Sequence, residues 1–340
     1  MNRYKEKILL QLKAKEKTIW EILKEWPYSM EEFVETMNLL YKNGLIKTNG
    51  KTISLKNNGE KALGNINLLM DFDEVKCFEC QGKTVRFSGK WLKVLEEFKS
   101  IAKHRPKISL DYYQGYMRPE DTISRIMFMH AHGDVWKKSI VIVGDDDLIS
   151  LGLGISSLPS RITVLEADPR YREFINHVSK AKGLDIEFIE YDVRKPLSKD
   201  LLNKFDVFIT DPLETIQGIK TFLSRGVSCL KDKGVGYFGL SRLDASSKKW
   251  FKIESMILKM SFIITDIIKG FSYYPTSEEA YEEGPFVKKL KFKIPIPSNT
   301  DWYHSYLFRI EALSKPIPLI KWNKKSRFRY YDNEDLIYPR

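Results

Sequence analysis

The sequence has few cysteines and no long apolar stretch, and each of these shortages excludes a class of protein. Three cysteines in 340 residues are too few for a disulfide framework and agree with a protein of the reducing cytoplasm. No apolar run approaches the roughly 20 residues of a membrane-spanning helix, and the basic N-terminus lacks a signal-peptide core. With 43% apolar and 13% aromatic residues, the chain is neither disordered nor collagen-like. We expect a globular protein of two or three domains.

The chain has fewer acidic than basic side chains, and its formal net charge is +11. Such a balance favours a nucleic-acid partner only when the basic residues share one region. Residues 1–118 hold 22 basic and 15 acidic side chains, whereas residues 119–275 hold 22 and 21. Lysine is far commoner than arginine, which is typical of a thermophile's surface and could explain the charge by itself. We therefore expect no nucleic-acid partner on charge alone.

Residues 18–63 have the pattern of a winged helix-turn-helix. Ser29 and Glu32 form a capping box at the start of the second helix, and Asn49-Gly50 is a turn signal between two short β runs. The second helix would read DNA, but it carries Glu31, Glu32 and Glu35, which would repel phosphates. We expect a winged-helix domain over residues 1–65 that serves dimerisation or acts as a lid.

Residues 66–118 are expected to connect the two main domains, and they contain Cys77 and Cys80. Two cysteines at this spacing are half of a four-thiolate metal site. Cys229 stands alone, so the chain supplies no second pair. Either two chains of a homodimer pool their pairs around zinc or iron, or the pair is a turn without metal.

From residue 138 onward, strand patterns alternate with helix patterns. We expect parallel strands over residues 139–143, 161–165, 186–189, 205–209 and 234–240. Helices are expected over residues 145–157, 169–182, 215–230 and 247–259. Residues 262–274 and 303–310 are β-type runs that could pair as a closing antiparallel hairpin. The order predicts an α/β, Rossmann-like fold of the S-adenosylmethionine-dependent transferase type over residues 119–314, followed by a flexible acidic tail over residues 315–340.

Carboxylates follow four of these strands, at the sheet edge where such folds bind ligands. They are Asp145, Asp146 and Asp147 after Gly144; Glu166 and Asp168; Asp192; and Asp211. Glu166 is placed to accept from both ribose hydroxyls, and Asp192 from an adenine amino group. These positions predict an adenosyl ligand, although strand-end carboxylates also serve as helix caps.

The first of these loops indicates which adenosyl ligand binds. Methyltransferases usually place the methionine carboxylate against a glycine-rich loop and a helix N-terminus. Three consecutive aspartates would repel that carboxylate, whereas decarboxylated S-adenosylmethionine keeps only its ammonium. A cleft that also holds Asp211 and Glu214 suits a polycationic acceptor, and one carboxylate can act as the base for the attacking amine. A carboxylate metal site or a helix-capping run remains an alternative for the three aspartates.

The sequence contains three motifs: Tyr113-Gln114-Gly115-Tyr116, Gly144-Asp145-Asp146-Asp147-Leu148 and Thr210-Asp211-Pro212. In this order they resemble the motifs of a known family, the branched-chain polyamine synthases, also called N4-bis(aminopropyl)spermidine synthases. The resemblance covers most of the chain. It departs from the family pattern at Asp211-Pro212-Leu213-Glu214, where Asp-Pro-Pro-Tyr is usual, and at His132-Gly133-Asp134, where Arg-Gly-Asp is usual.

The resemblance implies an aminopropyltransferase. Such enzymes move two aminopropyl groups from decarboxylated S-adenosylmethionine to the secondary amine of spermidine and release methylthioadenosine. The resemblance implies that the base is one of Asp145, Asp146 and Asp147. Analogy with linear spermidine synthases implies that Asp147 contacts the donor amine and that Asp146 or Asp147 faces the acceptor, and we expect Asp147 to be the base. An acidic C-terminal segment would help to hold the acceptor. The charge of the cleft and this resemblance together predict acceptor binding by Tyr113, Asp211, Glu214, Glu334, Asp335 and Tyr338.

Two other functions remain open on the sequence. A nucleic-acid methyltransferase would use the winged helix for targeting and Asp211-Pro212 to hold its amine. That reading lacks the aromatic residue that would stack on a flipped base after Asp-Pro. A winged-helix regulator that senses polyamines or nucleosides would keep the pocket and lack turnover.

Overall fold

The computed structural model describes residues 2–64, 77–275, 284–296, 298, 300–334 and 336–337. The N-terminal part consists of helices α1 (Arg3–Ala14), α2 (Ile19–Lys24) and α3 (Met30–Lys42), the hairpin β1 (Ile46–Thr48) and β2 (Ile53–Leu55), and helix α4 (Asn57–Leu63). Capping boxes begin α2 at Thr18 and α3 at Ser29. These elements form the expected winged helix, and α1 is an additional helix before it.

A seven-stranded sheet forms the rest of the molecule, in the order β5-β4-β3-β6-β7-β9-β8. Its parallel strands are β3 (Ser139–Val143), β4 (Arg161–Glu166), β5 (Ile186–Glu190), β6 (Phe205–Thr210) and β7 (Leu230–Leu240). Strands β8 (Phe262–Tyr273) and β9 (His304–Ala312) pair with each other and with β7 in antiparallel register. The predicted Rossmann-like α/β fold with a closing antiparallel hairpin is confirmed.

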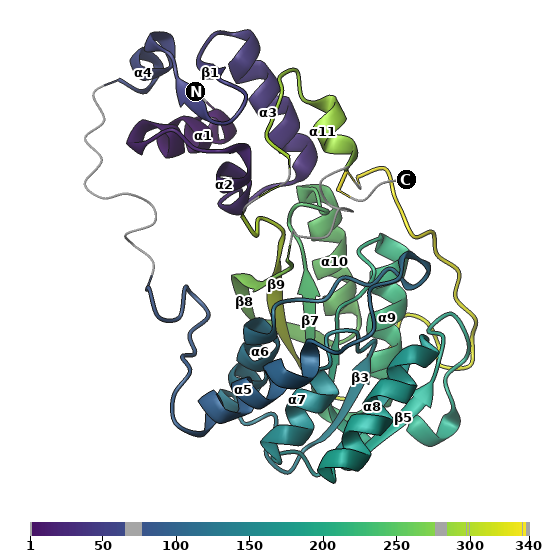
Figure 1. Ribbon diagram of the computed structural model, residues 1–340. Coiled ribbons are helices and arrows are strands. Elements are labelled where there is room, and N and C mark those ends of the chain that lie inside the picture. The colour runs from purple at the N-terminus through teal and green to yellow at the C-terminus, as the bar shows by residue number, and fades with distance from the viewer. Residues whose placement is uncertain are drawn as a thin grey trace.

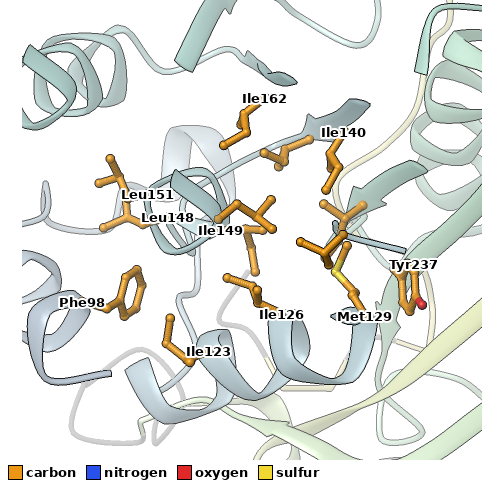
Figure 2. Close-up of a cluster of buried hydrophobic side chains, with 14 of the residues drawn as sticks. Phe98, Ile123, Ile126, Met129, Ile140, Leu148, Ile149, Leu151, Ile162 and Tyr237 are labelled. Carbon is orange, nitrogen blue, oxygen red and sulfur yellow. The ribbon is translucent and has the colours of Figure 1, made fainter. Parts of the chain in front are cut away.

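Helices cover both faces of the sheet. Successive side chains of a strand point to opposite faces, and in the central strands both sets are buried. Ile140 and Ile142 of β3 belong to a core beneath α5 (Lys90–Ala102), α6 (Pro119–Ala131), α7 (Ile149–Ser156) and α8 (Pro169–Lys182). Figure 2 shows this core between Ile123 and Ile126 of α6 and the strands. Val141 and Val143 face the other core, under α9 (Ile216–Cys229) and α10 (Ser247–Lys259).

The expected helix over residues 145–157 begins later than predicted, at Ile149. Residues Asp145 to Asp147 stay in the loop because their carboxylates accept hydrogen bonds from other backbone groups, described below. Leu148 adopts the left-handed conformation (φ 57°) directly before the first helical residue. The loop is therefore longer than the helical pattern suggested, and it turns its three side chains in different directions.

The N-terminal helices share one apolar core with residues from the other end of the chain. Trp20 of α2 stacks on Trp302 with ring centroids 5.5 Å apart, and its indole N–H donates to the carbonyl of Pro295. Helix α11 (Pro285–Lys289) lies against α3 in Figure 1, and Asn38 of α3 hydrogen-bonds the backbone of Lys289 and Lys291. In the described part of the chain, no helix is long and apolar enough to cross a membrane.

The C-terminal segment runs along the side of the sheet region, where it is yellow in Figure 1. Buried Arg225 of α9 donates to the carbonyls of Lys321, Trp322 and Lys324. The backbone N–H of Ser326 donates to the carbonyl of Arg194 at 2.9 Å. The described tail residues therefore contact the sheet region at several points, and the flexibility that we expected of this segment stays a prediction.

Candidate active site

A cavity of about 520 Å³ opens at the carboxyl ends of the parallel strands. Its walls come from the loops after β3, β4, β5 and β6, from residues 111–115, and from the C-terminal segment. Seven of the residues singled out in the sequence lie on its lining: Tyr113, Gly144, Asp146, Glu166, Asp192, Asp211 and Glu214. The remaining described candidates, Asp145, Asp147, Asp168, Glu334 and the cysteine pair, do not line it.

The three consecutive aspartates have separate surroundings. Asp145 is 1% exposed, and its Oδ1 accepts from the backbone N–H of Ser150 in the first turn of α7, at 3.3 Å. The Oδ1 atom of Asp147 accepts from the backbone N–H of Met117 at 2.7 Å. Only Asp146 lies on the cavity wall, where its Oδ2 accepts from the backbone N–H of Gly115 at 3.1 Å. The segment Gly115–Met117 therefore braces this loop and leaves one carboxylate facing the cavity.

Burial raises the pKa of each of these carboxyl groups. For Asp146 the hydrogen bond from Gly115 opposes the effect of burial, and the charge of Asp211 adds to it. For Asp147 burial and the charges of Asp146 and Asp211 raise the pKa well above its usual range. A carboxylate with a raised pKa is a stronger base, so Asp146 is suited to take a proton from an ammonium in the cavity.

Glu166 ends β4 and lines the cavity. Its Oε2 accepts from the backbone N–H of Asp145 and its Oε1 from that of Asp168, both at 2.8 Å. Burial raises its pKa to about 7 despite these hydrogen bonds. Asp168 lies behind the wall, caps α8 and accepts from the side chain of Gln114 at 2.8 Å. Asp168 is thus a structural cap here, and Glu166 is the acid that a ligand in the cavity can reach.

Asp192 follows β5 and pairs with Arg194, with Oδ2 and Nη2 2.9 Å apart. Burial alone would raise the pKa of Asp192, but the hydrogen bonds from Arg194 outweigh it and lower the pKa. Arg194 also donates to the hydroxyl of Tyr330, whose ring stacks on Tyr113 with centroids 4.5 Å apart. Asp192 therefore stays ionised beside an aromatic wall that joins the 111–115 segment to the tail.

Asp211 is held by residues that the sequence did not suggest. Its Oδ1 accepts from Nη1 of Arg125 at 2.8 Å, and its Oδ2 accepts from the hydroxyl of Tyr274 at 3.0 Å. A Cβ atom on Gly239 of β7 would lie 2.2 Å from Oδ1 of Asp211, so only glycine allows this close approach. Nothing in the local sequence marks Arg125, since it lies inside an ordinary amphipathic helix.

One end of the cavity has additional carboxylates. Oε1 of Glu214 accepts from the backbone N–H of Ser241 at 2.7 Å, and burial followed by the charge of Asp244 raises its pKa well above the usual range. Lys249 pairs with Asp332 of the tail, with Nζ and Oδ2 2.8 Å apart. Glu214, Asp244 and Asp332 all line the cavity, so negative side chains outnumber positive ones at this end.

The other C-terminal candidates and the cysteine pair are placed elsewhere. Glu334 accepts from the backbone N–H and the hydroxyl of Ser246 at the start of α10 and does not line the cavity. Asp335 and Tyr338 lie outside the described residues. Cys77 and Cys80 form a turn with free thiols, and the described part of the chain brings no group of three or more metal-ligating side chains together. A site pooled by two chains of a homodimer stays a prediction.

Comparisons with known proteins agree with one another. A family model described as the branched-chain polyamine synthase A C-terminal domain matches residues 93–335. The chain is 36% identical over 298 residues to the N(4)-bis(aminopropyl)spermidine synthase of Thermococcus kodakarensis. This match covers 87% of this chain and 84% of that protein. It is 37% identical over 300 residues to the protein of the same name from Methanocaldococcus jannaschii, covering 86% and 83%.

A solved structure matches the fold over nearly the whole chain. It is the branched-chain polyamine synthase of Thermus thermophilus in complex with N4-aminopropylspermidine and 5′-methylthioadenosine. The TM-score is 0.84 at 28% identity, and the match covers 98% of this chain and 93% of that one.

Proposed function

Because the chain belongs to the branched-chain polyamine synthase family, we propose that it transfers aminopropyl groups from decarboxylated S-adenosylmethionine to the secondary amine of spermidine. Its products would be N4-aminopropylspermidine, N4-bis(aminopropyl)spermidine and methylthioadenosine. The observation that carries the proposal is the position of Asp146, a half-buried carboxylate on the cavity wall after β3. The complex of the Thermus relative with an aminopropylated polyamine and methylthioadenosine supports it.

The first loop favours a donor without a carboxylate. In many transferases of this fold a helix N-terminus and its loop accept an anionic ligand group. Here the side chain of Asp145 already accepts from the Ser150 N–H of that helix, and Asp146 faces the cavity. A methionine carboxylate would meet negative charge and an N–H that is already bonded. The ammonium of the decarboxylated donor would instead be attracted, while Glu166 and Asp192 would hold its ribose and adenine.

Asp146 is the group that we assign as base. Spermidine enters as a cation, so its secondary ammonium must first give up a proton, which Asp146 accepts. The freed nitrogen lone pair then attacks the methylene carbon next to the sulfonium. That carbon–sulfur bond breaks, and its electrons leave with neutral methylthioadenosine. The product is a tertiary ammonium, which can lose its proton to Asp146 once that carboxyl has released the first proton to solvent. The freed nitrogen then attacks a second donor, which gives the quaternary product.

The acceptor's other ammonium groups need carboxylates on the cavity wall. The Glu214 end of the cavity, with Asp244 and Asp332, provides them. Glu214 stands where the family usually has an aromatic residue. We therefore propose that this end holds a terminal ammonium of the polyamine.

One assay separates this function from its rivals. The purified protein is incubated with decarboxylated S-adenosylmethionine and spermidine, and products are identified by mass spectrometry. We expect methylthioadenosine together with singly and doubly aminopropylated spermidine. Parallel reactions contain intact S-adenosylmethionine, and norspermidine or spermine as acceptor. Turnover only with the intact donor would indicate a methyltransferase, and binding of polyamine with no turnover would indicate a regulator.

A further inference from the structure

The most conspicuous ion pair at the cavity joins Arg125 of α6 to Asp211. Arg125 is 1% exposed, and all three of its guanidinium nitrogens are placed by side chains. Nε donates to the Ser272 hydroxyl at 2.9 Å, Nη1 to Asp211 at 2.8 Å and Nη2 to the Ser305 hydroxyl at 3.4 Å. Such a fork fixes the guanidinium in one orientation, so Asp211 meets a permanent and immobile positive charge.

The surroundings of Asp211 contain four other titratable groups besides Arg125. They come from the loop after β3, from the loop after β6 and from the end of β8: Asp146, Asp147, Glu214 and Tyr274. The neighbours contributed by β7 and β9, Gly239 and Ser305, carry no charge. Lys249 of α10 also lines the cavity, but its ammonium pairs with Asp332, whereas the guanidinium of Arg125 hydrogen-bonds Asp211 directly.

We propose that Arg125 is a positioning residue that neutralises the negative charge of Asp211. The attacking nitrogen of the acceptor can then lose its proton to Asp146 while it lies beside Asp211. This role rests on the proposed function. An uncompensated carboxylate beside the nitrogen would stabilise its ammonium form, and the ammonium has no lone pair with which to attack. With Asp211 paired to Arg125, an oxygen of Asp211 can still orient an N–H of the acceptor. The compensation leaves Asp146 as the carboxylate that takes the proton.

The proposal predicts opposite changes in binding and turnover. In Arg125→Gln, Asp211 loses its partner, and spermidine should bind more tightly because its ammonium is stabilised. The value of kcat should fall, and the pH at which kcat rises should move upward by about one unit. A residue that only supports the fold would weaken binding and turnover together and leave that pH unchanged. Spermidine KM and kcat are measured from pH 6 to pH 10 with saturating donor.

Three further variants test charge separately from shape. Arg125→Lys keeps the charge, so the pH at which its kcat rises should equal that of the wild type, even if its maximal kcat is lower. Asp211→Asn leaves Arg125 uncompensated, so kcat should rise at a lower pH while spermidine KM increases. The double variant Arg125→Gln with Asp211→Asn should return the pH profile toward that of the wild type. Asp211→Asn keeps the proposal testable if Arg125→Gln fails to fold.

The control is Arg309→Gln, which removes a comparably buried arginine from its pair with Asp134 outside the cavity. It should lower the melting temperature without moving the pH profile. The positioning role is overturned if Arg125→Gln has the wild-type profile, or if Arg125→Lys shifts it as far as Arg125→Gln does. An inactive wild-type protein would overturn the proposed function itself, and this role with it.

Discussion

At the scale of the residue, Asp146 differs from its two neighbours in what its carboxylate can reach. Asp145 accepts from the Ser150 N–H and Asp147 from the Met117 N–H, whereas Asp146 lies on the cavity wall. Burial raises the pKa of all three. Only a carboxylate that contacts the substrate converts a raised pKa into faster proton transfer, so the geometry favours Asp146 over Asp147.

The first prediction compares two isosteric variants. Asp146→Asn removes the base and should lower kcat by about 10²- to 10⁴-fold. Asp147→Asn keeps an oxygen to accept from the Met117 N–H and resembles the protonated acid, so its loss should stay below about tenfold. Initial rates of methylthioadenosine release measure both. A larger loss in Asp147→Asn would return the base to Asp147, the residue that analogy with linear synthases put at the donor amine.

The second prediction concerns Glu166 and the stability of the protein without ligands. Its folded pKa of about 7 exceeds the ordinary value of 4.5, so the protonated acid favours the folded state. That stabilisation is complete below pH 4.5 and is lost as the pH rises through 7. Its size is about 3 kcal/mol. Because Glu166→Gln cannot titrate, its melting temperature should fall less than that of the wild type between pH 4.5 and pH 8.

Glu187→Gln is the control for this pH dependence. Its hydrogen bond with Arg161 lowers the pKa of Glu187, so the wild-type group stabilises the fold above its unfolded pKa and loses that contribution as the pH falls. Its removal should therefore change the pH dependence in the opposite direction, and only slightly, because the pair is half-exposed. If the melting temperatures of the wild type and Glu166→Gln fell equally between pH 4.5 and pH 8, the raised pKa of Glu166 would be contradicted.

The sequence could locate the acids and could not orient them. Carboxylates at parallel strand ends must meet at one sheet edge, so Glu166, Asp192 and Asp211 were found from strand periodicity alone. Which of three consecutive aspartates faces the cavity depends on loop dihedrals, such as the φ of 57° at Leu148. Arg125 was missed because it reaches Asp211 across 86 residues of sequence.

At the scale of the element, the C-terminal segment completes the cavity. Phe328, Tyr330 and Asp332 line it, together with Glu166 of β4 and the carboxylates in the loops after β3, β5 and β6. The strands and helices of the sheet were predictable because their apolar periodicity is local. The path of the tail was not predictable, because backbone carbonyls bound to Arg225 hold it in place. Every residue has such a carbonyl, so the residue types do not show which ones are bound.

The third prediction tests this anchoring. Arg225→Met keeps an apolar stem but removes the donors to Val193, Lys321, Trp322 and Lys324. The tail should loosen, and spermidine KM should rise more than donor KM, because Tyr330 and Asp332 would no longer be held at the wall. Hydrogen exchange at the Leu197 and Ser326 amides, which pair with Trp322 and Arg194, reports the loosening.

Arg309→Met serves as the control for tail anchoring. It also removes a buried arginine, and it should lower stability without faster exchange at Leu197 and Ser326. Unchanged exchange in Arg225→Met would show that the stacking of Tyr113 on Tyr330 is enough to hold the segment.

At the scale of the whole molecule, net charge and local charge have opposite signs. The chain carries +11, yet the cavity is lined by an excess of carboxylates. The helix expected to enter a DNA groove is not basic either. Helix α3, which would enter DNA, exposes Glu31 and Glu35 and packs against α11 through Asn38. A local acidic surface is decisive for a polycation because screening limits charge effects to about 10 Å.

The fourth prediction follows from that separation of charge. Duplex DNA of about 20 base pairs should bind the protein more weakly than about 10 μM at 150 mM salt, within the range of non-specific contacts. Replacing Glu31 and Glu35 by Lys should strengthen binding if carboxylates on α3 are what repel phosphate. Fluorescence anisotropy at several salt concentrations measures both proteins. Submicromolar binding by the wild type would mean that the winged helix reads nucleic acid despite its acidic face. No gain in the double variant would mean that contact with α11, rather than charge, keeps α3 out of the groove.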